Sequence, residues 1–233
     1  MKRNIIGWSV FVLIILSNTV SAQNLPIKLG LRVAPNIGWM NSDAKHYTND
    51  GISGGITIGF VSEFYFLEHY AFSTGFNFMF LNGKLKYPDI QLLEGKTIKD
   101  EGVLSRKYNF TYLEIPLMLK MKTKEFGKFD FYVQIGFGTG FRLKTKSRDT
   151  FQPTNQESVT DKNEITNKTA QIRESVLIGT GTEFHVDEST TLLLGFSYSN
   201  SLNNVLLGNN IKYPDVRAQG LLNYAELNIG VLF

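Results

Sequence analysis

The chain has 233 residues, with 24 basic and 21 acidic side chains and no cysteine. The absence of cysteine excludes thiol catalysis, cysteine-ligated zinc, iron–sulfur clusters and a lipoprotein anchor. The formal net charge of +3 includes Lys2 and Arg3, and without these two residues the balance is 22 − 21 = +1, which gives no electrostatic basis for nucleic-acid binding.

Residues 1–22 have the pattern of a secretory signal peptide. Lys2 and Arg3 precede an apolar stretch over 5–16, and Val20-Ser21-Ala22 offers small residues before a cleavage point. An anchor helix is the alternative, but about 12 apolar residues are too few to cross roughly 30 Å of hydrocarbon. We therefore expect cleavage after Ala22 and an exported domain over residues 23–233.

Beyond residue 26 the chain alternates apolar with polar or small residues, the period of a β-strand. Eight such segments are expected, at 27–34, 55–66, 70–80, 112–121, 129–143, 176–186, 192–199 and 224–233. Short connections at 67–69, 123–128 and 187–189 alternate with much longer ones between the other segments. This predicts an all-β fold, an eight-stranded antiparallel transmembrane β-barrel with short periplasmic turns and long extracellular loops, and both chain ends on the periplasmic side.

The distribution of glycine predicts which face of the strands points outward. About half of the 21 glycines fall in the polar phase, and the narrow lumen of an eight-stranded barrel needs small residues. The large apolar residues therefore face lipid. Aromatic residues should form one interfacial girdle at the short-turn ends and another at the long-loop ends: Phe64, Phe66, Tyr70, Phe72, Phe129, Phe131 and Phe184 in the first, and Trp39, Phe80, Phe141 and Tyr198 in the second.

Charged residues in the inward phase predict a network that fills the lumen. Buried charges must be paired and hydrogen-bonded, so we expect Arg32 and Arg142 to bridge neighbouring glutamates, as a structural plug rather than an ion pathway. Pro116 removes a donor from its strand, which predicts a bulge or kink there. The inward charged residues are Arg32, Glu63, Glu114, Arg142, Glu183 and Glu226.

The segment Tyr112-Leu113-Glu114-Ile115-Pro116-Leu117, followed by Lys120, resembles a strand of the PorT-like outer-membrane β-barrel family. The glycine-rich 136–140 stands where that family has its next hairpin arm. The C-terminus, with Leu227, Ile229, Val231 and Phe233, looks like the insertion signal read by the barrel-assembly machinery. The resemblance covers roughly residues 25–233 and implies an integral outer-membrane protein; the family's namesake is tied to type IX protein secretion.

Candidates for chemistry are few. His46, His69 and His185 are too dispersed for a metal cluster, and the sequence has no nucleophile elbow, phosphate loop or HExxH motif. His185 lies two residues from Glu183 on the inward face and offers a candidate general-base pair. We expect a structural histidine there, no cofactor and no metal.

A tetrapeptide, Lys-Tyr-Pro-Asp, occurs at 86–89 and again at 212–215. Proline followed by aspartate predicts a tight turn in each copy, and exposed tyrosines on two such turns could form a recognition surface. The polar stretch from Thr145 to Ala170 is expected to be a mobile third loop. The candidate recognition residues are Tyr87, Pro88, Asp89, Tyr213, Pro214 and Asp215.

The sequence favours a non-enzymatic outer-membrane barrel that acts as a scaffold or interaction platform through its extracellular loops. An envelope or protein-secretion assembly is the candidate setting. Two alternatives stay open: a lipid-modifying barrel enzyme and a small passive channel. The partners expected are outer-membrane lipid, the barrel-assembly machinery during insertion, and envelope or secretion-system proteins, but no nucleic acid.

Overall fold

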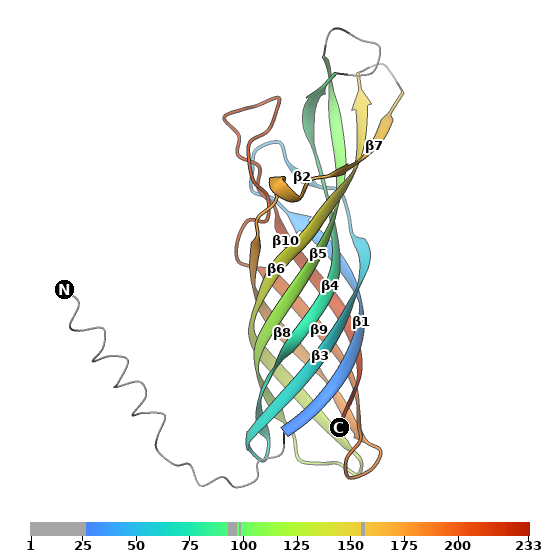
Figure 1. Cartoon of the computed structure of the whole chain (residues 1–233), viewed down its shortest axis with the longest axis vertical. Helices are drawn as coiled ribbons and strands as arrows, with labels where there is room; N and C mark the ends of the chain where they lie inside the picture. Colours follow the sequence, from blue (N-terminus) through green and yellow to red (C-terminus); the bar gives the residue numbers. More distant parts are fainter. Residues whose placement is uncertain (1–26, 93–96, 98, 155–156) are drawn as a thin grey trace, which may run out of the picture.

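A computed structural model of the chain describes residues 27–92, 97, 99–154 and 157–233, and the expected signal peptide over 1–22 lies outside these residues. The strands wind around a common axis and form a tall barrel (Figure 1). No helix among the described residues is long and apolar enough to cross a membrane.

Eight long strands form the ring, each antiparallel to its neighbours. Pairing of the first strand with the last closes it, so the predicted eight-stranded barrel is confirmed. Two short strands pair with outer parts of the ring, and one 3-10 turn accompanies them. The ring strands are β1 (Ile27–Asn41), β3 (Ser53–Leu67), β4 (Tyr70–Gln91), β5 (Asp100–Lys122), β6 (Phe129–Pro153), β8 (Ile172–His185), β9 (Thr191–Ser201) and β10 (Leu221–Leu232); the additions are β2 (Thr48–Asn49), β7 (Val159–Glu164) and η1 (Thr166–Lys168).

The short connections lie at one end of the barrel. They join β3 to β4, β5 to β6 and β8 to β9, as the sequence predicted. The start of β1 and the C-terminus lie at the same end (Figure 1), where Leu29 N–H donates to the Phe233 carbonyl at 3.0 Å. We call this the short-turn end and the opposite one the outer end.

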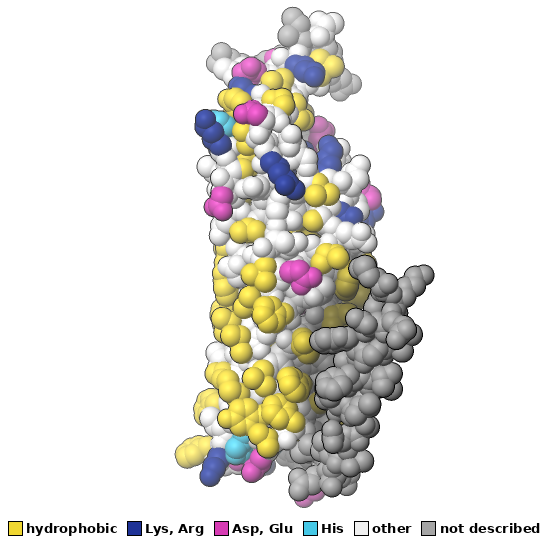
Figure 2. All heavy atoms as spheres, turned by 90° about the vertical axis from the view of Figure 1, so that its left-hand side faces the viewer, with side chains coloured by type: hydrophobic (Ala, Val, Ile, Leu, Met, Phe, Trp, Pro, Cys, Tyr) yellow, Lys and Arg dark blue, Asp and Glu magenta, His cyan; other side chains and the backbone are white. Residues whose placement is uncertain are grey.

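Large apolar side chains cover the outside of the barrel, as predicted. Ile135 is 48% exposed and Phe137 60% exposed, whereas the inward Leu177 is 6% exposed. In Figure 2 hydrophobic side chains gather over the lower half of the molecule, and most charged side chains lie above them or at the bottom rim. Aromatic rings also meet near both ends of this belt, with Phe66 4.9 Å from Phe72 and Trp39 6.0 Å from Tyr198 between ring centroids.

The second and third long loops were predicted wrongly. Strands β4, β5 and β6 have 22, 23 and 25 residues, against 11 in β9, and their ladder runs out to the pair Gln91 and Asp100. With β7 paired to the outer part of β6, they form a sheet that rises above the ring (Figure 1). The stretch from Thr145 to Ala170 is therefore strand, hairpin and 3-10 turn over much of its length rather than an irregular loop.

A bulge in β6 explains why the alternation could not be followed into this extension. Thr111 of β5 pairs with Lys144 and Tyr112 pairs with Arg142, so Leu143 is the extra residue. One inserted residue reverses the faces of everything beyond it: inward residues are even-numbered at Asp130 and Tyr132, and odd-numbered beyond Leu143. The alternation is therefore interrupted at Leu143, although β6 itself continues to Pro153.

Pro116 carries no register shift, so the bulge predicted there is wrong. Its ladder with β6 is regular, but the ladder with β4 omits the two pairs between Thr74 and Asn77. Gly75, in this gap, has φ +145°, and a Cβ there would lie 2.0 Å from the Phe60 carbonyl oxygen. The kink therefore lies in the strand opposite the proline.

Gly75→Ala is expected to lower the free energy of unfolding by about 1–3 kcal/mol, because the substitution places a Cβ in a backbone conformation that only glycine adopts easily. Denaturant unfolding in detergent micelles measures the loss. Gly127→Ala is the matched control, since Gly127 also has a positive φ (+68°) but no atom within 4 Å of its Cβ position. An equal loss in both variants would show that close packing at Gly75 contributes nothing.

Candidate functional site

A network of ion pairs fills the lower lumen. Lys120 of β5, fully buried, contacts both Glu63 of β3 and Glu183 of β8. Lys122 lies 2.7 Å from Glu183 and 2.7 Å from Asp130. Two lysines thus join carboxylates from three other strands across the interior.

A second layer lies higher and is centred on Arg32 of β1. Its guanidinium is 2.7 Å from Glu226 on the neighbouring β10, and it donates to Asn77 of β4 at 3.2 Å and to Asn228. A lumen cavity of about 60 Å³ lies among these groups. A cavity of this size has room for a few water molecules.

The third layer is built on Arg173 of β8, a side chain 1% exposed. It pairs with Glu114 at 3.3 Å and donates to Ser199 at 2.7 Å and to the Leu222 carbonyl at 3.0 Å. Above it the interior becomes apolar, through the buried cluster that includes Met79 and other side chains of β4, β5 and β10. Ion pairs and apolar packing together close the barrel along its axis.

The structure brings together Arg32 and Glu226 as the sequence predicted, but the prediction for Arg142 is wrong. Among the described residues no glutamate contacts Arg142, which donates instead to the carbonyls of Thr166 and Thr169, because it lies beside the bulge and faces η1. Glu114 pairs with Arg173.

Three cations of the network were missed. Lys120 and Lys122 share the inward phase of Glu114, a signal that the sequence offered. The sequence offered no such signal for Arg173, because this residue lies at the start of β8, before the alternation of that strand becomes visible.

A cavity of about 220 Å³ lies at the outer end, between the extended sheet and the connection from β9 to β10. Tyr47 stacks on Tyr87 with ring centroids 4.5 Å apart, and Asn210 donates to the Tyr47 hydroxyl at 3.3 Å and to the Pro88 carbonyl at 3.1 Å. We call this space the outer cavity; its lining includes Tyr47, Tyr87, Asp89, Arg106, Tyr108 and Asn210.

One carboxylate oxygen in the outer cavity has no partner. Asp89 is 2% exposed; its Oδ2 accepts from Gln91 at 3.1 Å, but its Oδ1 is buried without a hydrogen bond. The nearby Arg106 is fully engaged by Asp149, at 2.7 and 2.6 Å. A buried acceptor without a donor is costly, so Oδ1 is suited to accept a hydrogen bond from a ligand.

The phenols of the outer cavity stay neutral. Burial raises the pKa of Tyr47, Tyr87 and Tyr108 above the ordinary value for tyrosine, because an apolar environment disfavours the phenolate. At neutral pH each hydroxyl can therefore both donate and accept a hydrogen bond.

The two Lys-Tyr-Pro-Asp segments have different structures. The copy at 212–215 is a turn, closed by Val216 N–H donating to the Tyr213 carbonyl at 2.9 Å, as predicted; Pro214 and Asp215 are exposed, and half-buried Tyr213 stacks on His46. The copy at 86–89 lies within β4, so the predicted turn is wrong. The extended ladder with β5 continues through Tyr87, Pro88 and Asp89, and it turns the tyrosine and the aspartate into the outer cavity instead of exposing them.

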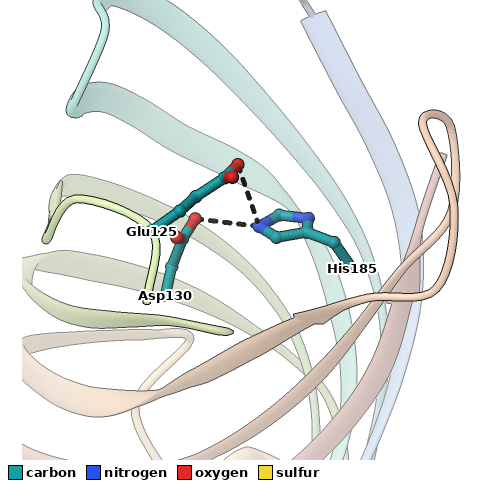
Figure 3. A group of neighbouring side chains, drawn as sticks. All are labelled: Glu125, Asp130 and His185. Atoms are coloured by element: carbon teal, nitrogen blue, oxygen red, sulfur yellow. Dashed lines mark hydrogen bonds and ion pairs between the residues drawn. The ribbon is translucent and has the colours of Figure 1, made fainter. Parts of the chain in front are cut away.

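His185 does not pair with Glu183. Its Nε2 lies 2.9 Å from Asp130 and its Nδ1 lies 3.0 Å from the Thr191 hydroxyl, whereas Glu183 binds the two lysines. Figure 3 shows the imidazole facing Asp130, with Glu125 on the same side. Thr191 is only 2% exposed, so its hydroxyl is out of reach of a substrate, and this hydrogen-bonded chain is not arranged for catalysis.

Comparison with known proteins finds barrels of bacterial outer membranes. No curated protein sequence matches the chain. Similar solved structures are Neisserial surface protein A (11% identity, 88% of this chain and 95% of that chain, TM-score 0.43), OprG from Pseudomonas aeruginosa (8%, 88% and 94%, 0.42) and the outer membrane protease OmpT from Escherichia coli (9%, 92% and 98%, 0.36).

The family comparison covers most of the chain. Residues 21–207 match the family described as outer membrane protein beta-barrel domain, which is more than half of the chain. A closed ring of strands with an apolar exterior also pairs the backbone groups of neighbouring strands without water, as a lipid environment requires. The chain belongs to this outer-membrane β-barrel family and is located in the outer membrane.

Proposed function

We propose that this protein is a non-enzymatic scaffold of the outer membrane that binds its partner at the outer end. The observation that carries the proposal is the outer cavity, with the unpartnered Asp89 Oδ1 beside neutral tyrosine hydroxyls. The extended sheet of β4, β5, β6 and β7 offers further polar surface around the cavity. Envelope or secretion-system proteins are the proposed partners, and the motif Tyr112–Leu117 supports a place in the PorT-like branch of the family.

The C-terminal strand supports a second partner, the barrel-assembly machinery, which would bind the chain only during insertion. Leu227, Ile229 and Phe233 are 46%, 54% and 60% exposed on the lipid-facing side of β10, with Val231 in the same phase. An alternating apolar strand that ends in an aromatic residue is the signal that we propose the barrel-assembly machinery recognises here.

Site-specific photo-crosslinking in cells tests whether a partner binds at the outer end. A photoreactive residue at Ile211, which is 60% exposed beside the outer cavity, is expected to capture the same protein or glycan in repeated experiments. Asp89→Leu, which removes the unpartnered acceptor without touching position 211, should reduce the adduct at least tenfold. A photoreactive residue at Phe126, 82% exposed at the short-turn end, is the control. No reproducible adduct at Ile211 would contradict the proposal.

Single-channel recording tests the passive-channel alternative. Because three layers of paired charges and an apolar cluster fill the lumen, planar bilayers containing the purified barrel are expected to show no steps of porin size. A porin from the same membrane, purified in the same detergent, serves as the positive control. Steps of comparable size would favour a channel over a scaffold.

A further inference from the structure

The geometry points to a divalent metal site of the zinc class at the short-turn end, formed by His185, Asp130 and Glu125. These residues come from the end of β8, the start of β6 and the turn before β6. One ligand atom from each lies within 4.8 Å of the other two, and Figure 3 shows the three side chains converging.

The distances are close to those that zinc requires. Zn²⁺ with bonds of about 2.0–2.1 Å to nitrogen and oxygen places tetrahedral donor atoms about 3.3 Å apart. His185 Nε2 is 2.9 Å from Asp130 Oδ2 and 3.9 Å from Glu125 Oε1. Glu125 is 68% exposed at its side chain, so small changes in its rotamer bring its oxygen to bonding distance.

The imidazole is oriented by contacts at both ring nitrogens. Its Nδ1 lies 3.0 Å from the Thr191 hydroxyl, and histidine ligands in metal sites are oriented in the same way by a hydrogen bond to the other ring nitrogen. The 2.9 Å contact between Nε2 and Asp130 is a hydrogen bond, and a bound ion would take the place of its proton.

A second, independent observation is the unsatisfied carboxylate of Asp130. The residue is 3% exposed, and its Oδ1 is buried without a hydrogen-bond partner. Lys122 does not neutralise it fully, because the lysine lies 2.7 Å from both Asp130 and Glu183 and its single charge is divided between them. An ion held by both carboxylate oxygens of Asp130, in place of the hydrogen bond between His185 and Oδ2, would satisfy Oδ1.

The donor set selects the class of metal. Ca²⁺ and Mg²⁺ prefer six or more oxygen ligands, whereas one imidazole with two carboxylates suits Zn²⁺ and its first-row neighbours. The ion would fasten the turn 123–128 to the end of β8, where the His185 N–H already donates to the Lys128 carbonyl at 2.9 Å.

Zinc titration of the untagged, refolded barrel in detergent, stripped of metal by a chelator, tests the inference. Calorimetry should give one Zn²⁺ per chain. Glu125→Gln and His185→Ala should weaken binding by about 100-fold or more, and Thr191→Val by about 10–100-fold, since outer hydrogen bonds contribute that much to metal affinity. Co²⁺ should produce visible absorption bands in the native chain that are absent in His185→Ala.

His69→Ala is the matched control, because His69 also lies in a short turn and has one carboxylate nearby, Glu68 at 3.9 Å. It should bind Zn²⁺ with native affinity. Absence of saturable binding would overturn the proposal, as would binding lost in His69→Ala and retained in His185→Ala. Circular dichroism of each variant checks that the barrel is folded, and Glu125→Gln, on an exposed turn residue, keeps the test valid if His185→Ala does not fold.

Discussion

Lys120→Met is expected to lower the free energy of unfolding of the barrel by about 3–5 kcal/mol, because it leaves Glu63 buried without its lysine and Glu183 with Lys122 alone. Glu63 and Glu183 are 1% and 0% exposed, so water cannot replace the lysine. Denaturant unfolding in lipid vesicles, followed by circular dichroism, measures the loss.

Two controls define the origin of this loss. Lys144→Met removes an exposed pair, with Lys144 2.7 Å from Glu164, and should cost less than about 1 kcal/mol. The triple variant Lys120→Met, Glu63→Gln, Glu183→Gln should recover part of the stability, since no net charge stays buried. If Lys120→Met and Lys144→Met cost the same, the lower lumen is hydrated and the structural plug is refuted.

Phe137→Arg is expected to destabilise the barrel in lipid by about 2–4 kcal/mol, the range for arginine on the lipid face near the bilayer midplane. Phe137 is 60% exposed in the middle of the apolar belt. The measurement is the unfolding midpoint of barrels refolded into vesicles.

The effect depends on where the arginine lies. One control therefore changes the same residue to another apolar one, and the other introduces arginine at an exposed position elsewhere. Phe137→Leu should change the stability by less than about 1.5 kcal/mol because it remains apolar. Thr160→Arg, on the exposed β7 above the belt, should stay within about 0.5 kcal/mol. A Phe137→Arg protein as stable as these two, or a native barrel that remains soluble without detergent, would contradict the lipid-facing exterior.

The ring could be predicted from the sequence because its two environments differ so much. Lipid outside and a narrow lumen inside impose the period of two, and Ile135, Gly136 and Phe137 follow it without exception. In the extension above the belt, water replaces lipid outside, and apolar side chains such as Leu85 and Leu104 are buried inside. The apolar phase therefore changes sides, and this change, together with the bulge at Leu143, concealed the outer parts of the three long strands.

The contacts of the lumen were harder to predict than its composition. Sequence gives the face of each residue, but the partner across the barrel depends on how far neighbouring strands are staggered. Arg32 meets Glu226 on the adjacent strand, a pairing of the kind that was predicted. Lys120 reaches Glu63 and Glu183 on strands that are not its neighbours, and no local pattern contains that information.

The lining of the outer cavity also depends on strand pairing that the local sequence does not reveal. Tyr87 and Asp89 were singled out for a motif that signals a turn, and they line the cavity because the extended ladder places them there. The segment could be singled out from the sequence, whereas its conformation was set by pairing with β5.

Closure of the ring between β1 and β10 has a consequence for biogenesis. The residues that pair there, such as Gly30 and Leu232, are far apart in the sequence, so the seam cannot form until β10 has been synthesised and exported. A chain without β10 has two unpaired edges, whose amide and carbonyl groups would cost several kcal/mol each in hydrocarbon. Such a chain is therefore not expected to close into a stable barrel in the bilayer.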